Sequence, residues 1–324
     1  MEEPKKVTLF FLLAVGQIIF AIPSMGYAKE PMQVTVGEDI VLVHAGPNVL
    51  LRYRYEDVPF KPYADQFFSP QGVNVLRDAP VDHKHHHGLM FAVAVDGVNF
   101  WEEHKAPGCQ AHRSFNDVKV GGESGGLPWA AFTQDIDWIN PRSQELLLDE
   151  RRTIELCRLK DAKAVLLTWQ SSFDVPSHKE SVTLTGSHYF GLGMRFVKSM
   201  DTGGQFRNAD GKTGNIVRGS ERLVRSRWCA YTARADGKSV TIAMFDYPQN
   251  RRPVTWFTMT KPFAYLSATL NLHKQPLKMM SDKPLVLRYG VALWDSQAES
   301  DQIEQLYQQW VVWPCERQQH SIMR

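Results

Sequence analysis

One short segment, residues 82–88 with the sequence DHKHHHG, holds four of the chain's eleven histidines within five positions. Histidine binds metal ions and exchanges protons near neutral pH more readily than any other side chain. Histidines gathered this densely indicate a functional site, because groups with tunable pKa values collect where chemistry takes place. A crowded, solvated loop is the alternative interpretation of the same residues.

A metal site is one chemistry that these residues predict. If the segment is extended, His83, His85 and His87 project to one side and His86 to the other. Two or three histidines with a carboxylate suit a divalent transition metal such as zinc, copper or iron. The carboxylate would come from residues 102–104, which follow the next hairpin.

Acid–base catalysis without a cofactor is the second chemistry. Such a site needs a proton acceptor and a proton donor with pKa values tuned towards the working pH. His85 or His86 would act as acid or base, and Glu102 or Asp246 would be the partner carboxylate. No cofactor is predicted in this interpretation.

Other residues are candidates for holding a small ligand. Arg195 lies in an otherwise apolar segment, where a guanidinium would bind a ligand oxygen or form a structural ion pair. Trp101 and Trp256 would supply an apolar floor, although tryptophans more often lie in the core because of the area that each buries.

Most of the chain after residue 30 has the period-two pattern of strands. The apolar alternation is clear at residues 164–169, 189–197, 240–245 and 285–293. Residues 89–95 and 98–101 flank Asp96-Gly97, a two-residue turn that is a strong signal for a hairpin. One helix is expected near the C-terminus, where Ile303, Leu306, Tyr307 and Trp310 fall on one face. These elements predict an all-β fold, a large two-sheet sandwich with one C-terminal helix.

The composition excludes some classes of function. The chain has 324 residues, with 37 Lys and Arg against 35 Asp and Glu. So small a net charge disfavours nucleic-acid binding, and the basic run at residues 218–227 is interpreted as a solvated face. The four cysteines form no CxxC pair, so a structural zinc site is not expected, and at most one disulfide is predicted. The oligomeric state is not predicted.

Residues 1–28 are typical of a secretory signal. Lys5 and Lys6 precede an apolar run, and Gly26-Tyr27-Ala28 fits a cleavage site. We therefore expect an exported protein, periplasmic or extracellular, whose mature chain is one domain of residues 29–324. An uncleaved anchor is the alternative, although the run is short for a bilayer span. No later segment predicts a membrane crossing.

Several motifs, in order, carry a resemblance to a family of secreted bacterial proteins called PmoA-like, or "methane oxygenase PmoA". In that family the histidine block usually reads D-H-P-H-H-R-G, so Lys84 and His87 stand here in place of proline and arginine. Tyr247 stands where the family often has histidine. The matching motifs are SPQGVNV at 69–75, the histidine block at 82–88, DGVNFW at 96–101, YFG at 189–191, MRF at 194–196, RWCAY at 227–231 and IAMFDYPQN at 242–250.

The family name does not describe a function for this chain, because a membrane methane-oxidising subunit needs several transmembrane helices. The resemblance implies a supersandwich of the galactose-mutarotase type, and proteins of that architecture commonly act on sugars. It thus predicts that a sugar or sugar derivative is bound or modified at the histidine block. Substrate contacts would come from His83, Arg195, Asn250, Trp101 and Trp256. A metal-dependent hydrolase or oxidoreductase and a non-catalytic carbohydrate-binding module are the alternatives.

Overall fold

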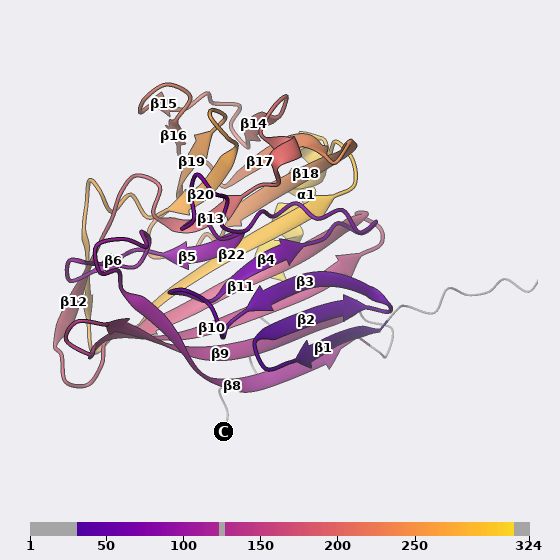
Figure 1. The fold of residues 1–324 in the computed structure, drawn as a ribbon. Coiled ribbons are helices and arrows are strands. Elements are labelled where there is room, and N and C mark those ends of the chain that lie inside the picture. Colours follow the sequence, from indigo (N-terminus) through magenta and orange to yellow (C-terminus); the bar gives the residue numbers. More distant parts are fainter. Residues whose placement is uncertain (1–30, 123–126, 314–324) are drawn as a thin grey trace, which may run out of the picture. The chain divides into compact units, whose positions relative to one another are not determined.

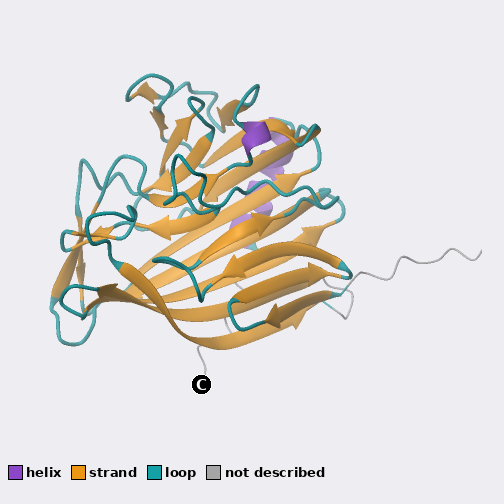
Figure 2. Cartoon of the chain, in the orientation of Figure 1, coloured by secondary structure: helices purple, strands orange, loops and turns teal. Residues whose placement is uncertain are grey.

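The computed structural model describes residues 31–122 and 127–313. The predicted signal segment therefore lies outside the described residues, as does Cys315. Strands are the dominant element of the described part (Figures 1 and 2). The paired strands of its sheets run antiparallel. The prediction of an all-β, two-sheet sandwich with one C-terminal helix is confirmed.

The first sheet has ten strands and carries the candidate site. In spatial order they are β1 (Met32–Val36), β2 (Ile40–Ala45), β3 (Asn48–Arg54), β4 (Tyr63–Phe67), β5 (Leu89–Ala92), β13 (Gly191–Arg195), β20 (Tyr265–Thr269), β19 (Thr255–Met259), β16 (Arg222–Val224) and β15 (Asn215–Ile216).

The second sheet has eight strands and packs against the first. In spatial order they are β14 (Gln205–Asn208), β17 (Trp228–Ala235), β18 (Lys238–Asp246), β22 (Leu285–Trp294), β11 (Ala164–Asp174), β10 (Glu145–Leu159), β9 (Trp129–Asn140) and β8 (Cys109–Gly121). A third sheet of four short strands is made of β21 (Leu277–Met280), β12 (Ser181–Thr185), β6 (Ala94–Val95) and β7 (Val98–Asn99).

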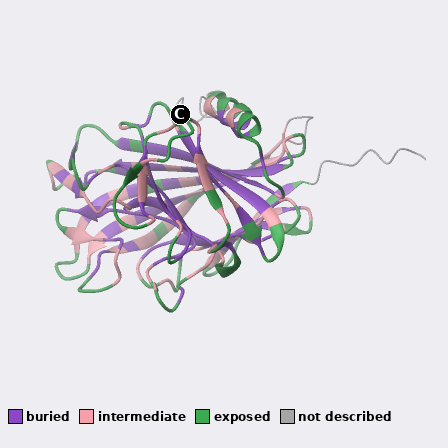
Figure 3. Ribbon diagram, turned by 90° about the horizontal axis from the view of Figure 1, so that it is seen from above, coloured by how far each residue is buried: buried purple, intermediate pink, exposed green. Residues whose placement is uncertain are grey.

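The main core lies between the two large sheets. On β22, Leu287, Tyr289 and Val291 face this core, because alternate residues of a strand share a face. Ala292 and Trp294, on the opposite face, join a second apolar cluster with the helix α1 (Ser300–Val312). Figure 3 shows the buried interior strands and the exposed outer side of this helix.

The predicted hairpin and helix are both present. Asp96 and Gly97 have φ angles of 47° and 82°, as the turn requires, and they join β6 to β7. The helix begins after Glu299, whose backbone N–H donates to Gln302 Oε1 at 2.8 Å. A three-residue 3-10 turn, Lys198–Met200, is the other helical element among the described residues. No described helix is long and apolar enough to cross a bilayer.

Candidate functional site

The histidine segment folds as two consecutive turns, so the extended conformation that the metal interpretation assumes is not present. The N–H of His83 donates to Pro80 O at 2.8 Å, and the N–H of His86 donates to His83 O at 3.0 Å. These i to i+3 bonds reverse the chain twice. They gather His83, His85 and His86, with ring centroids 4.8 Å apart for His83 and His86 and 4.5 Å apart for His85 and His86.

Gly88 ends this segment and lets the chain enter β5 beside β4. Its φ of 21° is in a region that other residues rarely adopt, and a Cβ there would lie 2.1 Å from Ala64 O. Glycine is therefore required for this close approach. The backbone of β4 consequently restricts the residue that ends the histidine segment.

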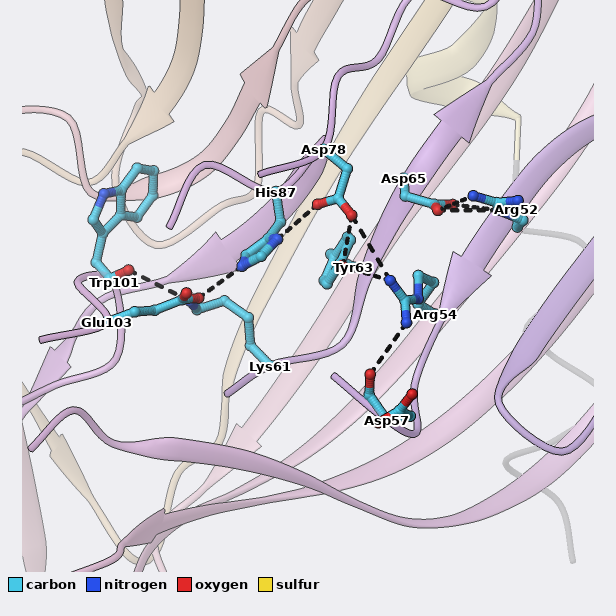
Figure 4. A network of polar contacts seen from close by, with 10 residues as sticks. All are labelled: Arg52, Arg54, Asp57, Lys61, Tyr63, Asp65, Asp78, His87, Trp101 and Glu103. Atoms are coloured by element: carbon cyan, nitrogen blue, oxygen red, sulfur yellow. Dashed lines mark hydrogen bonds and ion pairs between the residues drawn. The ribbon is translucent and has the colours of Figure 1, made fainter. Parts of the chain in front are cut away.

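The buried ring of His87 lies in a network of charged side chains (Figure 4). Its Nδ1 lies 2.7 Å from Asp78 Oδ1, and its Nε2 lies 2.8 Å from Glu103 Oε1. Burial opposes the charged imidazole, but the hydrogen bonds to the two carboxylates outweigh it and raise the pKa of His87. Because both ring nitrogens face carboxylate oxygens, we infer that His87 is held as a cation.

Lys61 and Tyr63, at the two ends of this network, connect the histidine turns to the segment at residues 101–103. The Lys61 Nζ lies 2.5 Å from Glu103 Oε1 and also donates to the backbone oxygen of Trp101. The Tyr63 hydroxyl donates to Asp78 at 2.9 Å, while its ring stacks on the ring of His87 at 4.3 Å. The turns at residues 80–88 and the segment at residues 101–103 are therefore anchored to one another.

The predicted metal set of His83, His85 and His87 is not assembled. Both ring nitrogens of His87 face carboxylates, so the ring offers no lone pair to a metal. Across the described residues, no group of three His, Cys, Asp or Glu side chains is arranged to hold a metal ion. The physical reason is the double turn, which separates His87 from its neighbours.

The other three histidines line one wall of a pocket of about 570 Å³. This volume is in the range of small-molecule sites. Its walls combine basic, acidic and aromatic side chains from five segments. The lining residues are His83, His85, His86, Glu102, Tyr189, Arg218, Gly219, Ser220, Glu221, Phe257, Met259, Lys261, Pro262, Phe263 and Tyr265.

Glu102 contacts both His85 and Tyr189, two residues that line the pocket. Its Oε2 lies 3.4 Å from His85 Nε2, and its Oε1 accepts a hydrogen bond from the Tyr189 hydroxyl at 3.0 Å. Burial lowers the pKa of His85, against the charge of Glu102, so that the ring is neutral near pH 7. The structure thus brings together the predicted pair of His85 and Glu102, and a neutral imidazole beside a carboxylate can accept a proton.

The floor of the pocket contains buried polar atoms without partners. Nδ1 of His86 and the hydroxyl of Tyr265 make no hydrogen bond to any described residue, although the two side chains are 7% and 2% exposed. Burial, with the charges of the neighbouring histidines and Arg195, lowers the pKa of His86 to about 2. His86 is therefore a neutral hydrogen-bonding group and not an acid near pH 7. Buried polar atoms rarely lack partners, so these two atoms have hydrogen-bonding capacity that the described residues do not use.

Residues 40–308 match a protein family described as a family of unknown function (DUF6807). The chain belongs to this family. The description does not include the PmoA-like name, so that resemblance stays a prediction. No curated protein matches the sequence.

Two solved structures with sugar-related names align with this family member. A GH36 α-galactosidase from Geobacillus stearothermophilus aligns with a TM-score of 0.51 at 9% identity, over 82% of this chain and 41% of its own. The chain thus spans about two fifths of that enzyme. A galactose mutarotase-like protein from Clostridium acetobutylicum aligns over 81% of this chain and 97% of its own, at 9% identity and a TM-score of 0.39.

Arg195 lies just below the pocket of this DUF6807 protein, but its terminal nitrogens are occupied. Nη1 lies 2.8 Å from Asp201 Oδ1 and donates to Ala264 O, while the guanidinium stacks on Phe263 at 3.9 Å. The structural ion pair, one of its two predicted roles, is present. Arg195 therefore supports Phe263 and is not among the lining residues.

The two predicted tryptophans are core residues that do not line the pocket. Trp101 stacks on Phe190 at 5.2 Å and Trp256 donates to Ser226 O, and both are fully buried. Trp101 and the hydroxyl end of Tyr265 pass over Gly193, where a Cβ would lie 2.7 Å and 2.0 Å from them. The absence of a side chain at Gly193 thus positions Tyr265 at the pocket floor.

Asp246, the last residue of β18, and Asn250, in the loop that follows it, lie elsewhere. Asn250 Nδ2 donates to Asp246 Oδ1 at 2.8 Å and to Arg288 O, and the N–H of Val254 donates to Asp246 Oδ2. Burial raises the pKa of Asp246 to about 6. The structure does not bring this pair to the histidine pocket, and its hydrogen bonds tie the loop to β22.

Sequence reasoning missed several lining residues. Tyr265 and Phe263 follow a proline in a short segment with no recognisable motif, and Glu221 lies in the basic run that was interpreted as a solvated face. The alternation on β20 would have indicated that Tyr265 shares a face with Ser267, but not which face is buried under loops.

Proposed function

We propose that the pocket lined by His83, His85 and His86 binds a sugar or sugar derivative and transfers a proton to or from it. The observation that carries this proposal is the His85–Glu102 pair in a pocket that is also lined by two residues with unpartnered polar atoms. These atoms are His86 Nδ1 and the Tyr265 hydroxyl. The pair can move a proton, and the floor can orient a polyhydroxylated ligand.

Each of the main lining residues has a distinct role. His85 accepts or donates the proton, and Glu102 orients its ring and stabilises the charged form. His86 Nδ1 and the Tyr265 hydroxyl bind ligand hydroxyl groups, because hydrogen-bonding capacity is left unused at both atoms. Phe257 and Phe263 offer an apolar surface to the less polar face of a sugar ring.

The fold supports a carbohydrate ligand only by analogy. The α-galactosidase described above acts, by its name, on a galactoside, and its similarity to this chain concerns the fold. Proton transfer requires only His85, Glu102 and the polar atoms of the pocket, whatever the fold family.

The test is a screen of monosaccharides and short oligosaccharides by calorimetry, with anomer and epimer exchange followed by NMR. For a sugar that turns over, His85→Ala should lower the rate about 10²- to 10⁴-fold while binding persists. His178→Ala, at an exposed histidine outside the pocket, is the matched control. Unchanged turnover in both His85→Ala and Glu102→Gln would refute the assignment, and saturable binding without any product would make the pocket a binding site alone.

We also propose that the protein is exported, on the strength of its N-terminal sequence. Fractionation of the native host, with N-terminal sequencing of the recovered protein, tests this directly. A chain beginning after Ala28 in the periplasm or medium supports the proposal, and an intact N-terminus in the cytoplasm contradicts it.

A further inference from the structure

A second, larger pocket of about 820 Å³ adjoins the histidine pocket. It lies over the edge of the ten-stranded sheet formed by β15 and β16. Five of its lining residues are basic and none is acidic: His188, Lys212, Arg225, His273 and Lys274. We name it the basic pocket.

The two pockets lie next to each other along one face of β19. Thr255 lines the basic pocket, whereas Phe257 and Met259 line the histidine pocket. These three residues alternate along β19 and so point to the same side, about 7 Å apart from one to the next. The His188 ring, between the pockets, contacts Phe257 at 5.3 Å and lies 3.2 Å from Glu221.

The charge of the basic pocket is only partly neutralised. Lys212 lies 3.6 Å from Asp210, and His188 faces Glu221. Arg225 and Lys274 form no ion pair with any described residue. Burial, together with His188 and Lys274, lowers the pKa of His273, as expected where basic groups crowd together.

We propose that the basic pocket binds the carboxylate or sulfate ester of an acidic oligosaccharide whose neighbouring sugar occupies the histidine pocket. This inference rests on the proposed function and specifies its substrate class. Arginine, lysine and histidine side chains bind such oxyanions through charge-assisted hydrogen bonds. The exposed side chains of Ile216 and Val217, at 69% and 39%, offer an apolar contact beside these charges.

The test compares acidic oligosaccharides with their neutral counterparts. The probes are trimers of glucuronate, galacturonate and mannuronate and a sulfated galactan tetrasaccharide, each beside its carboxyl-reduced or desulfated form, with sodium sulfate as the free anion. Calorimetry gives the affinities, and the imidazole NMR signals of His85 and His273 report on the two pockets separately.

We expect at least one acidic probe to bind ten-fold or more tightly than its neutral form and to move both signals. The double variant Arg225→Ala/Lys274→Ala should remove that preference and leave the affinity for the neutral form unchanged. Lys278→Ala, an exposed lysine outside both pockets, is the control and should change neither affinity.

The outcomes separate this inference from the proposed function. Neutral and acidic forms that bind equally, while moving the His85 signal, would overturn the acidic class and leave the proposed function standing. Sulfate that moves the His273 signal, with no oligosaccharide moving that of His85, would overturn both and leave a free-anion site. An acidic preference that survives in the double variant would also overturn the inference.

Discussion

His86 and His87 are neighbours in the chain, yet they stand in opposite environments. His87 lies between Asp78 and Glu103 with both nitrogens engaged, whereas His86 faces the pocket with Nδ1 unpartnered. Two equally buried imidazoles thus have pKa values shifted in opposite directions. The difference shows that the partners of a buried group, and not its burial alone, decide the direction in which its pKa shifts.

The largest effect on stability is expected at His87. Replacement His87→Leu leaves Asp78 and Glu103 without their shared cation, and we expect a loss of about 3 kcal/mol in the free energy of unfolding at pH 6. His83→Leu, in the same segment but with a half-exposed ring, should cost less than about 1 kcal/mol. Urea unfolding measures both.

The pH dependence of that loss tests whether the pKa values of His86 and His87 are shifted in opposite directions. Because the folded pKa of His87 is raised above 6.5, its contribution is complete below the unfolded value and disappears as the pH rises through the folded value. The gap between wild type and His87→Leu should therefore shrink at alkaline pH. The contribution of His86 to the pH dependence of stability has the opposite sign, since its lowered pKa makes stability fall as the pH drops below 6.5. A gap for His87→Leu that widens with pH would contradict the charged state.

A smaller effect is expected at the glycine that follows the two histidines. Gly88→Ala should cost about 2 kcal/mol, because the new Cβ meets Ala64 O and the backbone strain adds to the collision. Gly97→Ala is the control, since φ is also positive there but nothing lies within 4 Å. Equal losses in the two variants, measured by urea unfolding, would show that the contact with β4 has no energetic weight.

The smallest effect on stability is expected at Tyr265, and it tests the other half of the comparison. Tyr265→Phe removes a hydroxyl without a partner, so unfolding should change by no more than about 0.5 kcal/mol, while ligand affinity falls about ten-fold. Tyr53→Phe removes an equally buried hydroxyl that bonds to Gln134 and Arg152, and it should cost about 1.5 kcal/mol. If the two variants are equally destabilised in urea, the Tyr265 hydroxyl has a partner within the fold.

Local patterns predicted the architecture well, because each strand repeats its signal over many residues. The alternation at residues 285–293 and the Asp96-Gly97 turn correspond to β22 and to the β6–β7 hairpin. The sequence also named His85 with Glu102 as one of the possible pairs, and the two side chains lie 3.4 Å apart.

The rest of the site depended on tertiary contacts that no local pattern contains. Whether residues 82–87 are extended or turned is decided by their docking on β4 and on the network of His87. Asp246 has a raised pKa and the right chemistry, but β18 belongs to the other sheet. Tyr265 reaches the pocket floor because Gly193, far away in the sequence, lacks a side chain.

The double turn also restricts how this segment can change in evolution. One residue inserted between His83 and His86 would break the bond that closes the second turn and exchange the directions in which the following side chains point. The segment is thus sensitive to insertions and deletions, even though exposed Lys84 within it can accept many side chains. Homologues that keep this pocket should therefore vary in the composition of the segment but not in its length.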